Sequence, residues 1–185
     1  PILDRAKTIL YAPTFRGNSG EHQNFKLPFD YNFLDALPIN FRLVIKLHPC
    51  VNVQNIKVPN QYSNRVILLN SNEDVNEWMI FSDILITDYS SLIFEYALMD
   101  KPIIFYPYDL NDYFEERGFY FNYDSYTYGD VAKTQEELQQ AIIQAEDKKV
   151  FYSSKKQEFL EKFMSSCDGN SSKRIIDLIH TNKKD

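Results

Sequence analysis

The sequence predicts an α/β domain in which helices flank a parallel sheet. Short runs of branched and aromatic residues alternate with polar stretches that carry apolar residues at helical spacing. Runs that are apolar throughout, rather than at every second position, are typical of strands buried on both faces. Strands that alternate with helices in this way indicate βαβ units, so we predict a Rossmann-like sheet with right-handed crossovers.

Five runs are predicted strands and five stretches are predicted helices. The first strand, residues 8–11, ends before Pro13, and the second, residues 41–47, ends at His48-Pro49. The other predicted strands are residues 66–69, 84–87 and 102–106. The predicted helices are residues 72–81, 90–99, 135–148, 155–164 and 171–180. We expect residues 17–30 to form a polar, flexible loop and the tyrosine-rich residues 120–130 to be irregular.

Length and composition bound the organisation of the chain. Its 185 residues suffice for one α/β domain with a real core, and no repeat or linker divides them. We therefore expect a single domain over residues 1–185. The chain opens with Pro1-Ile2-Leu3-Asp4, which is untypical of a natural start, so we expect a fragment of a longer protein. The hydrophobic content of 44% argues against disorder, and the net charge of −6 argues against a nucleic-acid partner.

The cysteines and apolar runs exclude several other classes. Cys50 and Cys167 lack metal-ligand spacing, so we expect no metal site and no disulfide framework, and a reducing cytoplasm is the simplest interpretation. No apolar run reaches the roughly 18 residues that span a bilayer, and the first residues do not resemble a signal peptide. The lysine pairs at 148–149, 155–156 and 183–184 are typical of solvated helix faces, with an acidic membrane surface as the alternative.

The strongest local signal is the strand that runs through Thr87-Asp88-Tyr89 into Ser90 and Ser91. These serines are expected at a helix N-terminus, where unbonded N–H groups and two hydroxyls favour a phosphate. Simple N-capping is the alternative. Glu95 follows about one helical turn later and is a candidate for the hydroxyls of a ribose, unless it only faces solvent.

Two further polar residues follow predicted strands. His48 is expected at a strand's carboxyl end, a position suited to binding or acid–base work, although many such histidines are plain loop residues. The planar guanidinium of Arg16 can donate two hydrogen bonds to a phosphate, or else it makes an ordinary ion pair. The five glycines form no G-x-G-x-x-G, P-loop or G-x-S-x-G motif, which excludes nicotinamide, P-loop kinase and α/β-hydrolase chemistry. We expect no cofactor.

The ordered set of motifs resembles the CDP-glycerol:poly(glycerophosphate) glycerophosphotransferase family over roughly residues 7–180. The motifs are Tyr-Ala-Pro-Thr-Phe-Arg at 11–16, Lys-Leu-His-Pro at 46–49, Ser-Asp at 82–83, Asp-Tyr-Ser-Ser at 88–91, Asp-Lys-Pro-Ile-Ile-Phe-Tyr-Pro-Tyr-Asp at 100–109, Arg-Gly-Phe-Tyr at 117–120 and Asp-Gly at 168–169. The resemblance implies the C-terminal, donor-binding half of a two-domain GT-B fold. It also implies transfer of glycerol phosphate, or a related polyol phosphate, from a CDP-activated donor to a growing teichoic-acid-like polymer, with release of CMP.

The resemblance also implies roles for individual residues, all of them in donor binding. Pro13 and Thr14 are expected to contact the nucleotide, with Arg16 beside them. His48 is expected near the pyrophosphate as a catalytic candidate. The remaining expected donor contacts are Lys46 and Leu47 in the pocket wall, Ser90 and Ser91 on phosphate, and Glu95 on the ribose.

The implied catalytic base lies outside this sequence. Nothing here matches the Trp-His-Gly-Thr-type motif that the family carries in its N-terminal half, and the histidine of that motif is the candidate base. The resemblance therefore implies that this chain binds donor better than it turns it over and that a missing N-terminal domain is its partner.

The implied partners are CDP-glycerol or a related CDP-polyol and a lipid-linked polyol-phosphate acceptor. The implied location is the cytoplasm, peripheral at the inner face of the cell membrane. Two other functions stay open from the sequence. One is a GT-B nucleotide-sugar glycosyltransferase of capsule or wall polysaccharide synthesis, and the other is a non-catalytic interaction domain with the same fold.

Overall fold

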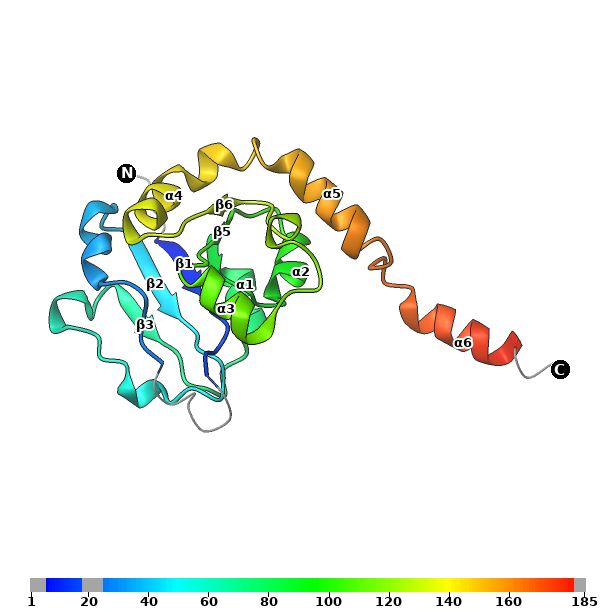
Figure 1. Ribbon diagram of the computed structural model, residues 1–185, viewed down its shortest axis with the longest axis horizontal. Helices are drawn as coiled ribbons and strands as arrows, with labels where there is room; N and C mark the ends of the chain where they lie inside the picture. The colour runs from blue at the N-terminus through cyan, green and yellow to red at the C-terminus, as the bar shows by residue number, and fades with distance from the viewer. Residues whose placement is uncertain (1–5, 18–24, 182–185) are drawn as a thin grey trace.

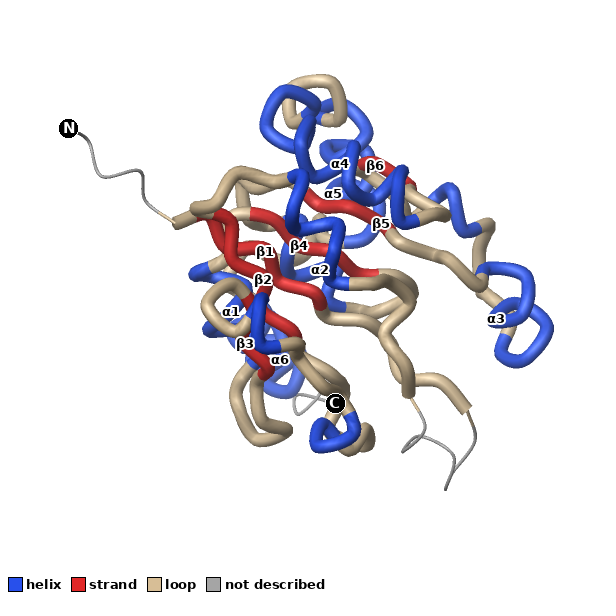
Figure 2. The backbone as a smooth tube through the Cα atoms, turned by 90° about the vertical axis from the view of Figure 1, so that its left-hand side faces the viewer, coloured by secondary structure: helices blue, strands red, loops and turns tan. Residues whose placement is uncertain are grey.

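Parallel strands form one sheet at the centre of the computed structural model, which describes residues 6–17 and 25–181 (Figure 1). The strands lie side by side in the order β3-β2-β1-β4-β5-β6, and every neighbouring pair is parallel (Figure 2). Their bounds are β1 Lys7–Tyr11, β2 Phe41–Ile45, β3 Val66–Leu68, β4 Ile84–Thr87, β5 Ile103–Phe105 and β6 Asp130–Val131. This sheet confirms the predicted Rossmann-like α/β class, and its strand order reverses between β1 and β4.

Helices cover both faces of the sheet. The α-helices are α1 Val75–Phe81, α2 Leu92–Ala97, α3 Leu110–Arg117, α4 Gln135–Lys148, α5 Ser153–Phe163 and α6 Ser171–Thr181. Short 3-10 turns are η2 Tyr31–Ala36, η3 Val53–Asn55, η4 Asn60–Tyr62 and η5 Tyr123–Ser125. Successive strand side chains point to opposite faces. Ile9 therefore packs in the core beneath α4 and η2, whereas Leu10 packs in the core beneath α1, α2 and α5.

Local sequence explains how the predicted helices begin. Thr134 accepts a hydrogen bond from the backbone N–H of Glu137, whose carboxylate in turn accepts from the backbone of Thr134, so a capping box opens α4. Asp74 accepts from the backbone N–H of Asn76 at 2.9 Å and caps α1. Asp74 lies inside the stretch predicted as helical, so α1 begins three residues later than expected, whereas α4 spans the predicted residues 135–148.

Besides the 3-10 turns, the structure adds one helix and one strand that the sequence did not predict. Helix α3 has only eight residues and none of them is buried, so Leu110, Tyr113 and Phe114 give too short a helical pattern to predict it. Strand β6 has two residues and lies at the sheet edge. The predicted strand 41–47 stops at Ile45, which leaves Lys46 in the loop that follows.

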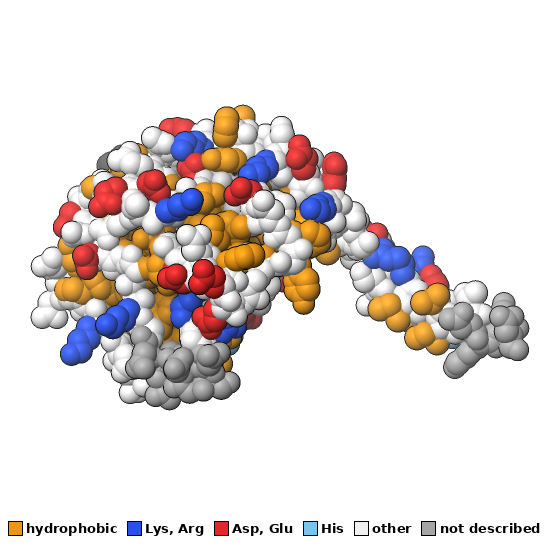
Figure 3. Space-filling view, in the orientation of Figure 1, with side chains coloured by type: hydrophobic (Ala, Val, Ile, Leu, Met, Phe, Trp, Pro, Cys, Tyr) orange, Lys and Arg blue, Asp and Glu red, His pale blue; other side chains and the backbone are white. Residues whose placement is uncertain are grey.

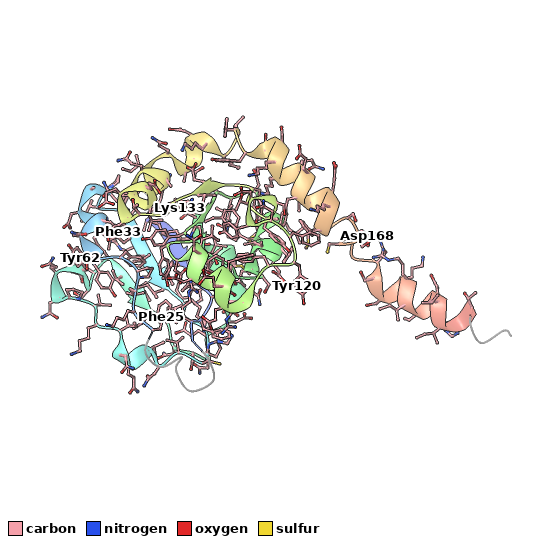
Figure 4. The ribbon with its side chains drawn as sticks, viewed as in Figure 1. Phe25, Phe33, Tyr62, Tyr120, Lys133 and Asp168 are labelled. Atoms are coloured by element: carbon pink, nitrogen blue, oxygen red, sulfur yellow. The ribbon has the colours of Figure 1, made fainter. Side chains whose placement is uncertain are left out.

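The segment predicted as a polar loop also needs correction where the structure describes it. Residues 18–24 lie outside the described residues, as do Pro1 to Arg5 and residues 182–185. Phe25 and Phe29 are buried in the same core as Phe33 (Figure 4), so residues 25–30 belong to the packed body of the domain. The aromatic rings outweigh the polar composition of the stretch because their burial removes a large apolar area from water.

Helix α6 extends away from the body of the domain (Figure 1). It begins after the turn at Asp168 (Figure 4), whose carboxylate accepts two hydrogen bonds from Arg174. Four apolar side chains of α6 are between 49% and 62% exposed, namely Ile175, Ile176, Leu178 and Ile179. They form an orange group on the helix in Figure 3. Among the described residues, no helix is long and apolar enough to cross a membrane.

A partly buried ion cluster ties together the loops that leave β1, β4 and β5. Arg16, after β1, donates from Nε and Nη2 to the Asp109 carboxylate at 2.6 and 2.9 Å. Its Nη2 also donates to Asp88, after β4, at 2.7 Å. The Asp88 carboxylate accepts further bonds from the backbone N–H groups of Thr14 and Tyr89 at 2.7 and 2.6 Å. Burial raises the pKa of Asp88, whereas these N–H groups and the Arg16 charge oppose that rise.

Aromatic rings surround the guanidinium of this cluster. The Arg16 guanidinium carbon lies 5.0 to 5.3 Å from the ring centres of Tyr89, Tyr108 and Tyr113. Cation–π attraction adds to the two carboxylate contacts in this position. Burial lowers the pKa of Arg16, but the bonds and charges of Asp109 and Asp88 outweigh burial and hold the pKa above its ordinary value. The arginine is thus a permanent charge at the centre of three loops.

We expect Arg16→Lys to destabilise the domain by about 2–4 kcal/mol, because an ammonium cannot reproduce the paired contacts of the guanidinium to Asp88, which is buried, and Asp109, which is partly buried. Urea denaturation followed by circular dichroism measures the change. Arg174→Lys is the matched control, since Arg174 also binds a carboxylate through two hydrogen bonds but does so at the exposed start of α6. Equal stability of Arg16→Lys and the unsubstituted chain would contradict a structural role for the cluster.

Candidate functional site

A hollow of about 340 Å³ lies at the carboxyl edge of the sheet, where the loops after β1, β2, β3 and β4 meet. Its position beside the β1–β4 reversal is where open α/β sheets bind ligands. The hollow is lined by Ala12, Pro13, Lys46, Leu47, His48, Pro49, Ser71, Glu73, Asp74, Val75, Ser90, Ser91 and Leu92.

Six of the nine residues predicted to bind the donor line this hollow: Pro13, Lys46, Leu47, His48, Ser90 and Ser91. They come from three loops that are far apart in the sequence. Thr14, Arg16 and Glu95 do not line it. Glu95 is exposed on α2, one turn beyond Ser91 and on the same helix face.

Lys46 supplies a buried cation to the hollow. Only 6% of its surface is exposed, and its Nζ donates to the carbonyl oxygens of Ser71 and Leu47 at 2.9 and 3.4 Å. An ammonium has three N–H donors, so at least one remains for a ligand. Burial lowers the pKa of Lys46, and the charges of Glu73 and Asp74 act in the opposite direction. An anionic ligand would favour the charged form further.

One ring nitrogen of His48, Nδ1, is hydrogen-bonded within the chain. Its Nδ1 accepts from the backbone N–H of Cys50 at 3.2 Å, and its ring packs against Phe15 with centroids 4.5 Å apart. With Nδ1 as an acceptor, the neutral ring carries its proton on Nε2. His48 is therefore held in a tautomer that donates from Nε2, which suits a phosphate oxygen.

The two serines differ in what their hydroxyls do. Ser90 Oγ accepts from the backbone N–H of Leu92 at 3.3 Å. Ser91 is the N-cap residue of α2, yet its hydroxyl makes no capping hydrogen bond. Capping therefore does not account for Ser91, and its hydroxyl can serve a ligand. Since α2 has only six residues, any anion here depends on hydroxyls and nearby cations more than on a helix dipole.

Two of the predicted donor contacts have other surroundings. The Arg16 guanidinium is bound to Asp88 and Asp109 and to the carbonyl oxygen of Thr14 at 2.6 Å, so its described contacts order loops. The hydroxyl of Thr14 is buried and has no hydrogen-bond partner among the described residues. Thr14 thus has an unused donor at the edge of the site, whereas the fork of Arg16 is engaged.

Sequence reasoning missed the acidic residues of this region. Asp88 and Asp109 stand inside quoted motifs, but only the fold shows that one arginine joins them. Glu73 was part of a predicted helix, whereas the structure places it in the loop before α1 and in the wall of the hollow. Across residues 6–17 and 25–181, no three His, Cys, Asp or Glu side chains are grouped as metal ligands.

A larger hollow of about 500 Å³ lies at the opposite edge of the sheet, against α4 and α5. Its lysines already have partners: Lys148 pairs with Asp130 at 2.9 Å and Lys149 with Asp100 at 2.6 Å. Lys156 donates to the carbonyl oxygen of Met99. These pairs make the larger hollow a weaker anion site than the one beside β1 and β4.

Comparison with known proteins identifies relatives of the whole described domain. The family model for CDP-glycerol:poly(glycerophosphate) glycerophosphotransferase matches residues 1–181. The teichoic acid poly(ribitol-phosphate) polymerase of Bacillus spizizenii is 38% identical over 183 residues, covering 97% of this chain and 28% of that protein. The teichoic acid glycerol-phosphate primase of Bacillus subtilis is 37% identical over 178 residues, covering 96% of this chain and 44% of that protein.

Solved structures agree with these relatives. The wall teichoic acid polymerase TagF superposes with a TM-score of 0.77 at 31% identity, over 97% of this chain and 44% of that chain. The glycotransferase of kitacinnamycin, at 17% identity and a TM-score of 0.54, shares the fold alone. The chain spans less than half the length of these relatives. With the family model matched almost end to end and relatives above 30% identity, this chain belongs to the CDP-glycerol:poly(glycerophosphate) glycerophosphotransferase family.

Proposed function

We propose that this chain is the donor-binding half of an enzyme that transfers glycerol phosphate, or a related polyol phosphate, from a CDP-activated donor to a growing teichoic-acid-like polymer. The observation that carries the proposal is the hollow in which Lys46, His48, Ser90 and Ser91 converge. Family membership supports it, and one TagF structure is of a variant soaked with CDPG. The relatives' names include both ribitol and glycerol phosphate, so the polyol stays open.

In the proposed reaction an acceptor hydroxyl oxygen attacks the phosphorus that carries the polyol. A new P–O bond forms, the bond to the bridging oxygen breaks, and CMP leaves with that oxygen while the hydroxyl proton passes to a base. Such transfers depend on positioning and charge stabilisation rather than on covalent chemistry from the protein. Lys46, His48 and the serine hydroxyls would stabilise the negative charge that grows on the leaving phosphate.

The base and the acceptor site are proposed to lie in a second, N-terminal domain, so that residues 1–185 form one half of a two-domain GT-B enzyme. The greater length of the relatives supports this division. The exposed apolar side chains of α6 support it as well, because Ile175, Ile176, Leu178 and Ile179 together leave a helix face unburied. A second domain packed there would remove that face from water.

The larger protein is further proposed to work at the inner face of the cell membrane, where a lipid-linked acceptor would be found. The turn between α4 and α5 supports this placement. Val150 and Phe151 are 79% and 77% exposed there. A pair of apolar side chains exposed on a turn can enter the headgroup region of a bilayer.

For the donor site, we expect Ser91→Ala and His48→Ala each to weaken CDP-glycerol binding about 10-fold, the loss of one hydrogen bond to a charged group. Calorimetric titration of the chain measures the affinity, with thermal melting as a check on folding. Ser154→Ala is the control, because Ser154 is an exposed serine far from the hollow on α5. Unchanged affinity in both site variants would refute the assignment.

The same titration separates the two alternative functions. Binding of a UDP-sugar in preference to CDP-glycerol would indicate a nucleotide-sugar glycosyltransferase. Failure of every nucleotide to bind would favour an interaction domain that has lost the donor site.

For the membrane surface, we expect the double substitution Val150→Ser with Phe151→Ser to lower sedimentation with phosphatidylglycerol–phosphatidylcholine vesicles about 10-fold, since two apolar side chains lose their lipid contact. Ile39→Ser is the control, because Ile39 is 77% exposed on another part of the surface. Equal sedimentation of the double variant and the unsubstituted chain would rule this turn out as the membrane contact.

A further inference from the structure

We propose that Glu73 selects a cytidine donor over a uridine donor by accepting a hydrogen bond from the exocyclic amine of cytosine. This inference rests on the proposed function, because it assigns the part of the same donor site that would hold the nucleobase. It concerns a residue that sequence reasoning did not single out and that the structure places in the wall of the hollow.

Positive and negative groups lie in different parts of the wall of the hollow. Lys46, His48, Ser90 and Ser91 offer cations and hydroxyls, whereas the loop between β3 and α1 contributes the carboxylate of Glu73. Among the described residues, that carboxylate makes no ion pair with Lys46, whose amine donates to carbonyl oxygens. A carboxylate repels phosphate, so the part of a nucleotide that lies against Glu73 must be one that donates hydrogen bonds.

Two hydrogen bonds within the chain hold the carboxylate of Glu73 in place. Its Oε1 accepts from the backbone N–H of Asn70 at 3.3 Å, and its Oε2 accepts from the Trp78 indole N–H at 3.2 Å. An ionised carboxylate has about four acceptor positions, so two internal bonds leave capacity for a ligand. The half-buried side chain is thus oriented before a ligand arrives, which lowers the entropic cost of binding.

The neighbouring carboxylate has a different role. Asp74 Oδ1 accepts from both the backbone and the side-chain nitrogen of Asn76 at 2.9 Å, as the cap of α1. Its contacts are explained by helix capping, and it is exposed. Of the two acids in the wall, Glu73 is therefore the one that is held in a fixed orientation and has acceptor positions left for a ligand.

Cytosine and uracil differ in the hydrogen bonds that they can make. Cytosine carries an amino donor at the ring position where uracil carries a carbonyl acceptor, and carboxylates accept from that amine. Against Glu73, cytosine gains a charge-assisted hydrogen bond. Uracil instead places its carbonyl oxygen against the carboxylate, so that two acceptors face each other. A buried polar mismatch of this kind discriminates more strongly than a difference in shape.

The test compares the affinities of CDP and UDP for the chain and for Glu73→Gln, by calorimetric titration. We expect the unsubstituted chain to bind CDP at least about 10-fold more tightly than UDP, the value of one good base contact. In Glu73→Gln the amide can donate to the uracil carbonyl, so the preference should fall to near unity through tighter UDP binding and weaker CDP binding. Asp74→Asn, which keeps the cap of α1, should retain the preference.

Trp78→Phe provides a second test of Glu73 that leaves its carboxylate unchanged. It removes the indole N–H that orients Glu73 but keeps an aromatic ring in the core, so the CDP preference should fall several-fold with little change in melting temperature.

An unchanged CDP-to-UDP ratio in Glu73→Gln would overturn the inference while leaving donor binding intact. An equal loss for both nucleotides would also overturn it, because Glu73 would then contact the ribose that they share. Failure of the unsubstituted chain to bind CDP would instead refute the proposed function itself.

Discussion

The arrangement of the carboxyl edge depends on one partly buried arginine between two carboxylates. Arg16 follows β1, Asp88 follows β4 and Asp109 follows β5, so a single guanidinium fixes three loops that no backbone ladder joins. Ser90 and Ser91 lie two and three residues beyond Asp88, and their position therefore depends on this cluster. A buried charge is costly unless it is paired and hydrogen-bonded. The two acids and the arginine satisfy one another, which makes the cluster a rigid support for the three loops.

That pairing leaves a different set of groups to meet an anion. Because the Arg16 charge is balanced by Asp88 and Asp109, it adds little positive potential to the neighbouring hollow. Among the residues that line the hollow, Lys46 supplies a buried cation whose described acceptors are carbonyl oxygens and not carboxylates. The chain has a net charge of −6, so its overall field does not attract an anion, and a local cation such as Lys46 has to provide the positive potential. The hollow therefore resembles a site tuned by a few contacts and not a generally basic surface.

The sequence predicted the sheet and most of the site because both follow from the strands. Buried apolar runs give the strands, and parallel strands bring their carboxyl ends to one edge, so Pro13, Lys46, His48 and Ser90 had to be neighbours. The contacts of Arg16 and Glu73 were not predictable in this way. Their partners are set by tertiary packing across segments with no common period. Helix α3 was missed because its eight residues are too few for a clear helical period and none of them is buried.

The geometry is also consistent with the proposal that this chain is one half of a two-domain enzyme. In phosphoryl transfer the attacking and leaving oxygens lie roughly in line on opposite sides of the phosphorus. Groups that stabilise the leaving phosphate, as proposed for Lys46, His48 and Ser91, therefore occupy the side away from the attacking hydroxyl. A base that activates that hydroxyl must approach from the other side, beyond the carboxyl edge of this sheet. One domain can then fix the nucleotide and its charge, while the facing domain brings the acceptor, and closure of the two sets the reactive distance.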